Sequence, residues 1–425
     1  MSYLEAGRPV ARALFLHKLS SYYGMRSLIY SLGIFPFHWN VTLWPVAALQ
    51  ALLAAYVIWL VIRSFVTRRT VLCYLMLCAL LGLLTTLSWY SVLILPDILG
   101  PLLYLCVYLI VFARETLSRL DRAALMVIIW WAAASHGSQM VIAAGLCVLL
   151  ILLLVFRRRF MERRWRSVGA VILVLAFSAA AQIALNAYLT GVPSLNGDWP
   201  PLLMARVIVD GPGRLYLETH CPDAKFAICE DAHNLPDSAD DFLWSDKGIW
   251  QSASEEKQAR LQHEEMQFVL ATLRAYPAEQ LKKSAANFGN QLTALGLDDL
   301  GSNDWVLGEF DRVLPREKSS FERSRQASDA LPLEFFSSVQ EWTVIASLIV
   351  MAAFLPYVWR HRPIRILGIG VVIISTVIAN ALVTGVLSGV ETRYQSRVIW
   401  LLPLLAALLI LDWRGNRSLN RANLE

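Results

Sequence analysis

Charge is scarce in this sequence, and so are the short motifs that identify most enzymes. Charged residues make up 17% of the chain and hydrophobic residues 56%, whereas a soluble domain carries about 25% charged residues. This balance excludes an ordinary soluble protein and predicts an integral membrane protein. The sequence contains no Walker loop, dinucleotide fingerprint, HExxH motif or nucleophilic triad. No run of acidic residues or lysines crosses the apolar segments, which argues against an ion-coupled transporter.

The few charges are divided unevenly along the chain. Residues 191–340 contain 24 acidic and 14 basic residues, whereas the remainder contains 9 acidic and 24 basic residues. We interpret the acidic part as a folded insert within a basic, apolar membrane body. The excess arginines lie in short clusters between apolar runs rather than on one soluble face, so the pattern does not indicate nucleic-acid binding.

Apolar runs of about 20 residues, long enough to cross a bilayer, predict the helices of the membrane body. The run at 123–156 is too long for one crossing, and we interpret it as a short hairpin with its tip at His136. The sequence therefore predicts an all-α, polytopic transmembrane bundle of about eight or nine spans with a mostly helical insert. The other predicted spans are residues 41–62, 71–95, 97–113, 168–190, 341–358, 366–388 and 396–412.

Five arginine clusters set the predicted orientation, because short basic loops stay in the cytoplasm. With a hairpin at 123–156, all five clusters fall on one side of a bacterial inner membrane, and the C-terminus is cytoplasmic. The clusters lie around Arg63, around Arg114, at 157–166, around Arg360 and around Arg414. The predicted parts are an exported or interfacial loop (1–40), a first helical group (41–190), an exported acidic insert (191–340), and C-terminal helices with a cytoplasmic tail (341–425).

Two of the six cysteines lie in the predicted exported insert, where the compartment is oxidising. Cys221 and Cys229, in HCPDAKFAIC, favour a local disulfide. A zinc site that also uses His220 and His233 stays open as an alternative, although the spacing matches no usual zinc pattern. The other four cysteines lie in predicted spans, where we expect them to pack as small apolar side chains.

Outside the insert, buried or interfacial carboxylates near the exported face are rare and therefore informative. Before residue 97 the chain has only Glu5, and Asp97 follows Pro96 in SWYSVLILPDILG. Asp97 is predicted to lie in the first turn of a helix, where a carboxylate complements the helix dipole without any chemical role. At the outer mouth the same side chain could instead bind Mg²⁺ or Mn²⁺, bind a sugar hydroxyl, or act as a base. No cofactor is certain from the sequence.

Three further residues are candidates on the same face. His136, at the hairpin tip, could bind phosphate or donate a proton near neutral pH, or could be a polar turn residue. Arg393 and Arg397 are four residues apart in ETRYQSRV, so on a helix they share a face. Arginines on the exported side indicate an anionic partner, such as a lipid phosphate or pyrophosphate, because guanidinium pairs with phosphate through two hydrogen bonds. Lipid headgroups or Glu391 would also satisfy them.

With this arrangement, the chain resembles the GT-C superfamily of integral membrane glycosyltransferases. The segments SYLEAG, SSYYGMRSLIY and LWPVAALQALLAAYVIWLVIR look like a first exported loop that leads into a second span. The resemblance covers most of the chain as architecture rather than as motif. It implies an active site on the outer face, where an inverting enzyme moves a sugar from a polyprenyl-phosphate donor to an envelope glycan or lipid acceptor.

The resemblance also implies roles for individual residues. Asp97 is placed like an acid of the second exported loop, and it or Glu5 would be the base or metal-binding acid, with His136 assisting. Arg393 and Tyr394 are placed like residues that meet the phosphate of a lipid-linked donor, and Arg397 would help to hold it. The aspartate that such enzymes commonly carry in the first exported loop is absent here. Either Asp97 or Glu5 takes its place, or the acid lies upstream of Met1, or the protein is not an active enzyme. Because the basic residues of the first predicted loop resist export and no apolar span precedes them in this sequence, we expect a first span upstream of Met1, which could also carry the aspartate.

A non-catalytic class of protein also fits the residues. It comprises polytopic envelope-assembly proteins and lipid-linked glycan exporters, in which the insert would bind a partner. An acyltransferase would require a repeated histidine site within the spans, and none is visible. The predicted partners are membrane lipids, a lipid-linked sugar donor and a glycan or lipid acceptor, with no nucleic acid.

Overall fold

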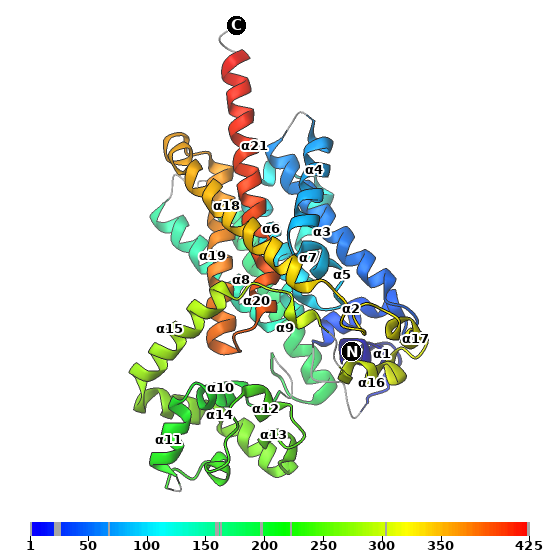
Figure 1. The fold of residues 1–425 in the computed structure, drawn as a ribbon, viewed down its shortest axis with the longest axis vertical. Helices are drawn as coiled ribbons and strands as arrows, with labels where there is room; N and C mark the ends of the chain where they lie inside the picture. Colours follow the sequence, from blue (N-terminus) through cyan, green and yellow to red (C-terminus); the bar gives the residue numbers. More distant parts are fainter. Residues whose placement is uncertain are drawn as a thin grey trace. The chain divides into compact units, whose positions relative to one another are not determined.

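All regular secondary structure in the described part of the chain is helical, which confirms the predicted all-α class (Figure 1). Residues 21–26 of the first predicted loop and half of the arginine cluster at 157–166, namely 158–160, 162 and 163, lie outside the described residues. The computed structural model describes residues 2–20, 27–66, 69–157, 161, 164–195, 199–221, 223–301 and 304–422, and no strand occurs among them.

The chain divides into two compact units. Unit 1 comprises Met1–Gly197, Leu295–Asn380 and Thr392–Glu425, and unit 2 comprises Asp198–Ala294 and Ala381–Glu391. The predicted insert at 191–340 therefore contributes residues to both units. The elements of unit 1 are α1 (Ser2–Leu16), α2 (Leu28–His38), α3 (Trp44–Phe65), α4 (Thr70–Leu84), α5 (Leu87–Val92), η1 (Pro96–Ile98), α6 (Leu99–Phe112), η2 (Arg114–Thr116), α7 (Arg119–Ser135), α8 (Gly137–Phe156), α9 (Trp165–Thr190), η4 (Asp298–Leu300), α16 (Asp304–Val313), α17 (Lys318–Glu322), α18 (Leu333–His361), most of α19 (Ile364–Leu387), α20 (Thr392–Ile399) and α21 (Leu401–Ala422).

Six stretches of helix among the described residues are long and apolar enough to cross a membrane. They are α3, α8, α9, α18, α19 and the stretch Thr392–Gly415, which combines α20 with most of α21. Large apolar side chains remain exposed on them; Trp342 and Trp359 of α18 are 71% and 79% exposed. A soluble protein rarely exposes continuous apolar surface of this kind, so these helices fit a multi-pass membrane protein.

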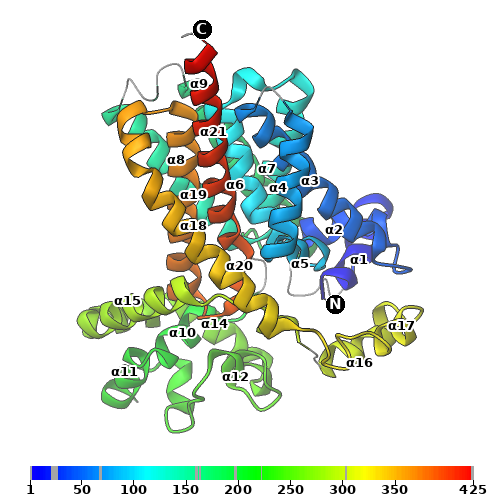
Figure 2. The same ribbon diagram turned by 45° about the horizontal axis from the view of Figure 1, so that its top comes forward.

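Helix α6 is the buried centre of unit 1. All 14 of its residues, LGPLLYLCVYLIVF, are buried, as expected for a helix that is apolar on every side. It contacts α3, α7, α8, α9 and α20 (Figures 1 and 2). Because its two ends lie in different polar surroundings, α6 separates the arginine-rich loops from the candidate site described below.

The arginine-rich loops meet at the C-terminal end of α6. Arg63, near the end of α3, donates a hydrogen bond to Asp121 at the start of α7, with 2.7 Å between Nη2 and Oδ2. Arg365, at the start of α19, donates to Glu115 of η2 at 3.0 Å. These contacts join loops that the sequence analysis predicts to lie on one side of the membrane.

The helical structure is interrupted at His136, which lies between α7 and α8 at the predicted hairpin tip. His136 has an extended backbone (φ −156°, ψ 127°), and its ring nitrogen Nδ1 accepts a hydrogen bond from the Ser138 N–H. A side chain that caps a helix N-terminus in this way replaces one of the missing helical hydrogen bonds. His136 therefore both ends α7 and begins α8.

The apolar run 71–95 is not one helix, so this predicted span is wrong in its continuity. Helices α4 and α5 are separated at Thr85 and Thr86. The Thr86 N–H donates to the Gln340 side chain at 3.0 Å, and its hydroxyl donates to the Ser396 carbonyl at 2.7 Å. Hydrogen bonds to a side chain of α18 and to a backbone carbonyl of α20 compete here with the helical pattern, and hydropathy does not reveal them.

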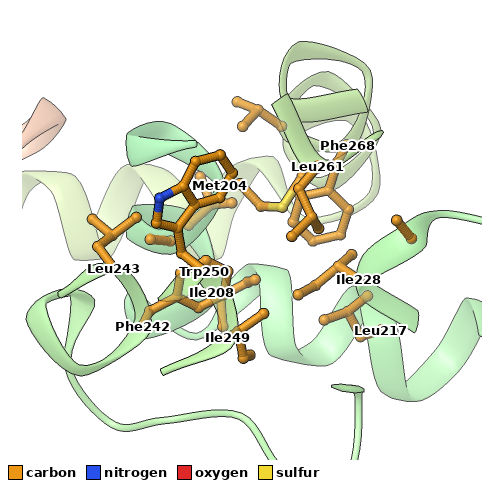
Figure 3. Close-up of a cluster of buried hydrophobic side chains, with 14 residues drawn as sticks. Met204, Ile208, Leu217, Ile228, Phe242, Leu243, Ile249, Trp250, Leu261 and Phe268 are labelled. Carbon is orange, nitrogen blue, oxygen red and sulfur yellow. The ribbon is translucent and has the colours of Figure 1, made fainter. Parts of the chain in front are cut away.

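Unit 2 is a small helical bundle with its own apolar core (Figure 3). Phe242 and Trp250 pack with Met204, Leu261 and Phe268 in this core. The sequence before Pro277 spaces Leu261, Met266, Val269 and Leu273 at helical intervals, a pattern that predicts an amphipathic helix. Helix α14 confirms it. The elements of unit 2 are α10 (Leu202–Val209), α11 (Pro212–His220), η3 (Ala227–Asp231), α12 (Ala239–Leu243), α13 (Ile249–Ser252), α14 (Glu255–Ala275), α15 (Pro277–Thr293) and the end of α19.

A buried polar network joins α10, α15 and the end of α19 within unit 2. Arg206 of α10 pairs with Asp210 at 3.3 Å and donates to the Gly385 carbonyl of α19 at 2.8 Å. Asp210 also accepts hydrogen bonds from Gln280 and Asn287 of α15, at 3.0 and 2.9 Å. The ion pair of Arg206 and Asp210 therefore joins α10, α15 and the end of α19.

Candidate functional site

A buried ion pair lies at the N-terminal end of α6. Asp97 belongs to η1, directly before α6, and Arg397 belongs to α20. Arg397 Nη1 donates to Asp97 Oδ1 at 2.8 Å, and the two side chains are only 1% and 6% exposed. Removing two charges from water is costly, so the protein keeps this pair against a considerable desolvation penalty.

Arg397 also connects the pair to His136. Its Nη2 donates to Ser138 Oγ at 3.2 Å and to Asn380 Oδ1 at 3.0 Å. Ser138 Oγ lies 2.9 Å from His136 Nδ1. Residues from η1, α8, α19 and α20 thus form one hydrogen-bonded cluster around the Arg397 guanidinium.

Arg393 lies one turn before Arg397 and is held chiefly through its backbone. Its N–H donates to Asp299 Oδ2 at 3.0 Å, and its carbonyl accepts a hydrogen bond from the Tyr90 hydroxyl at 3.1 Å. Its guanidinium carbon lies 5.3 Å from the centre of the Tyr394 ring, and that of Arg397 lies 5.4 Å from the same ring. Both cations therefore share one aromatic neighbour.

Two buried polar atoms near this cluster lack hydrogen-bond partners among the described residues, namely Arg393 Nε and Gln139 Oε1. Gln139 is next to Asp97 in space, because its Nε2 donates to the carbonyl of Pro96 at 2.7 Å. Most buried polar atoms in proteins are paired. One donor and one acceptor near Asp97 are therefore available to a polar ligand.

The structure brings together five of the six residues that the sequence analysis proposes for catalysis or donor binding. These are Asp97, His136, Arg393, Tyr394 and Arg397. The sixth, Glu5, is paired with a different residue: Arg312 of α16 approaches its two carboxylate oxygens at 2.5 and 3.0 Å.

The sequence analysis missed the uncharged members of the cluster. Asn380 donates to the Tyr394 carbonyl at 2.7 Å as well as accepting from Arg397, so it fixes the start of α20. Ser138 and Gln139 follow the hairpin tip directly. A single amide side chain within an apolar run, as at Asn380, was the available signal, because such residues in spans usually have a polar partner.

A disulfide joins Cys221 and Cys229 in unit 2. Both residues pack against the apolar core of that unit, and the disulfide links the end of α11 to η3. Its sulfur atoms are not available as thiolate ligands for zinc. Among the described residues, no group of three or more His, Cys, Asp or Glu is arranged to hold a metal ion.

We expect the double variant Cys221→Ser/Cys229→Ser to lower the free energy of unfolding of unit 2. The disulfide joins residues eight positions apart, and closing a loop of this length stabilises by about 2–3 kcal/mol. Proteolysis of the unit in increasing urea measures the loss. Dithiothreitol should shift the wild-type protein by the same amount and leave the double variant unchanged; a wild-type protein that is insensitive to reductant would contradict the prediction.

No family model, curated protein or solved structure matches the chain.

Proposed function

We propose that the protein is a membrane glycosyltransferase of the GT-C type, which moves a sugar from a polyprenyl-phosphate donor to an envelope glycan or lipid acceptor. The observation that carries the proposal is the meeting of Asp97, Arg393 and Arg397 at one end of α6. The arginine-rich loops lie at the other end of that helix, and such loops stay in the cytoplasm. The cluster would then face the exported side, where lipid-linked sugars are used.

The proposal includes a topology of nine crossings. The six long apolar stretches are joined by two shorter apolar helices, α4 and α6. The 17-residue helix α7 would be the ninth crossing. Alternating directions then place residues 1–40 and 191–340 outside and the C-terminus in the cytoplasm. All the arginine clusters fall on the cytoplasmic side in this arrangement, which supports it.

The two arginines would bind the donor phosphate. Guanidinium groups match phosphate oxygens with two parallel hydrogen bonds, and Arg393 Nε has a hydrogen bond to offer. Tyr394, beneath both guanidinium groups, would limit their movement. A phosphate that binds Arg397 would compete with Asp97 for the same guanidinium and so free the carboxylate for the acceptor.

Transfer would then need one carboxylate and two cations. The acceptor hydroxyl oxygen attacks the anomeric carbon of the sugar from the side opposite the phosphate, which inverts the configuration. The bond from that carbon to the phosphate oxygen breaks, and Arg393 and Arg397 stabilise the charge that collects on the departing phosphate. Asp97 accepts the hydroxyl proton. His136 is linked to Arg397 through Ser138, so a proton on His136 would change the electrostatic potential at the Asp97–Arg397 ion pair.

Cells that contain Asp97→Asn or Arg393→Ala in place of the wild-type protein test this function. Loss of a group that stabilises charge in a transition state costs about 100-fold or more in rate, so we expect the dependent surface glycan to disappear in both strains. Mass spectrometry of the surface glycans measures it. Arg360→Ala, an exposed arginine in a predicted cytoplasmic cluster, is the matched control and should leave the glycan unchanged.

Membrane levels of each variant must equal those of the wild-type protein for this comparison. If normally inserted Asp97→Asn and Arg393→Ala proteins leave every surface glycan unchanged, the enzyme proposal is wrong. The non-catalytic alternative, an envelope-assembly protein or a lipid-linked glycan exporter, would then be favoured.

A further inference from the structure

The C-terminal end of α19 marks the level of a membrane surface. The helix has 24 residues, which corresponds to about 36 Å at 1.5 Å per residue. The hydrocarbon core of a bilayer is about 30 Å thick. Arg365 lies in the first turn of α19 and Gly385 in its last turn, so Gly385 falls at the headgroup level opposite the arginine-rich end.

Helix α15 packs directly on this last turn. A Cβ atom added to Gly385 would lie 2.8 Å from Gln291 Cβ and 2.9 Å from the Asn287 carbonyl oxygen, so only glycine allows the two helices to approach this closely. Gln291 also exchanges two hydrogen bonds with the backbone of Glu391, at 2.8 and 3.0 Å. Helix α15 is therefore fixed at the same level as the end of α19.

One face of α15 is polar and buried, and the neighbouring face is apolar. Gln280, Asn287 and Gln291 form the buried face. Leu281, Ala285, Phe288 and Leu292 follow each other at intervals of four, three and four residues, so they form a single stripe along the helix. Leu281 is 72% exposed, Ala285 is exposed, and Phe288 and Leu292 are half-buried.

The charged residues of α15 avoid this stripe. At 100° per residue, Glu279 and Lys283 lie on the side opposite the stripe, whereas Lys282 borders it. All three are exposed. An exposed apolar stripe with a lysine at its edge is typical of a helix that lies in a membrane surface, where the lysine ammonium reaches the headgroup phosphates.

We propose that α15 is an interfacial helix, with the Leu281 stripe immersed in the phospholipid surface and Lys282 bound to headgroup phosphate. Phospholipid is the occupant because α15 is attached to the last turn of an apolar helix long enough to cross the membrane. The proposal does not depend on the enzymatic function.

Photo-crosslinking of the full-length protein in native membranes tests the lipid contact. A benzoylphenylalanine replaces Leu281 on the stripe or, as the matched control, Glu279 on the opposite side. We expect phospholipid adducts in mass spectra of the position-281 protein after irradiation, at several times the level of position 279. Ala285 and Lys283 provide a second pair, should the Leu281 variant fail to insert.

Equal lipid labelling on both sides of α15, or a protein adduct in place of lipid on the stripe, overturns the proposal. Lys282 is tested in nanodiscs by amide hydrogen exchange. With phosphatidylglycerol, Lys282→Gln should speed exchange in α15 several-fold, whereas in detergent it should have no effect. Identical exchange in wild-type and variant nanodiscs overturns the headgroup contact.

Discussion

Arg397→Gln is expected to lower the free energy of unfolding of the detergent-solubilised protein by about 3–5 kcal/mol, because it leaves the buried carboxylate of Asp97 without its counter-charge. Arg397 also donates to Ser138 and Asn380, so the loss includes two further hydrogen bonds. Thermal and denaturant unfolding, followed by intrinsic fluorescence in one detergent, measures the effect.

The double variant Asp97→Asn/Arg397→Gln distinguishes the effect of an unpaired buried charge from the effect of changed side-chain packing. An amide opposite an amide leaves no buried charge, so we expect it to recover most of the stability that Arg397→Gln loses. Arg312→Gln is the matched control, because its pair with Glu5 is exposed and such pairs contribute at most about 1 kcal/mol. Equal unfolding of the Arg397→Gln and Arg312→Gln proteins would contradict a buried pair.

This experiment also bears on the proposed function. If Asp97→Asn abolishes the surface glycan while the double variant is well folded and still inactive, the pair has a role beyond stability. If activity follows the folded fraction of each variant, the only role of the Asp97–Arg397 ion pair is to hold the N-terminal end of α6 against α20. Glycan levels are therefore compared per folded molecule, with folding measured on the same membrane preparation.

Asp210→Ala is expected to weaken the attachment of α15 to the rest of unit 2. The change leaves the Arg206 guanidinium, only 10% exposed, without a counter-charge, and it removes the acceptor for Gln280 and Asn287. Breaking a buried pair in this way costs about 3–5 kcal/mol. Amide hydrogen exchange of the full-length protein should then speed up in α15 by about 100-fold or more, since each 1.4 kcal/mol corresponds to about tenfold in the opening equilibrium.

Asp237→Ala is the matched control for this change. Asp237 also pairs with an arginine of unit 2, Arg214, but its side chain is 98% exposed, so solvent replaces the lost partner and exchange should not change. Unaltered exchange of α15 in the Asp210→Ala protein would show that the network does not hold the helix. Slower exchange with added lipid would connect the result to the interfacial role of α15.

The positions of most helices could be predicted, because a run of apolar residues has the same meaning wherever its neighbours lie. The break at His136 followed from the need to keep the arginine clusters on one side. The break at Thr85 and Thr86 could not be predicted, since its causes lie 254 and 310 residues away, at Gln340 and Ser396. Threonine also lowers mean hydropathy too little to divide an apolar run.

The candidate site shows the same limit. Asp97, Arg393 and Arg397 are identifiable because charge is rare in the membrane body near its predicted exported face, and this rarity can be read from the sequence. The pairing of Asp97 with Arg397 cannot be read from the sequence, and the sequence analysis gave the two residues separate roles. The two residues are 300 positions apart, and no periodicity connects them. Asn380 was overlooked because an uncharged amide is not rare in the same sense.

The separation of Asp97 from Arg397 has a consequence for the order of synthesis. A ribosome adds about 5–20 residues per second, so Asp97 precedes its partner, 300 residues further on, by about 15–60 s. Helix α6 is buried on every side in the complete protein. During that interval it is in the membrane, but α20 has not yet been synthesised and cannot pack against it. The nascent carboxylate would stay hydrated or beside the insertion machinery until the last apolar helix arrives. The site would then be the final part of the bundle to close, and a ribosome that stalls after α19 would leave a membrane-bound protein without it.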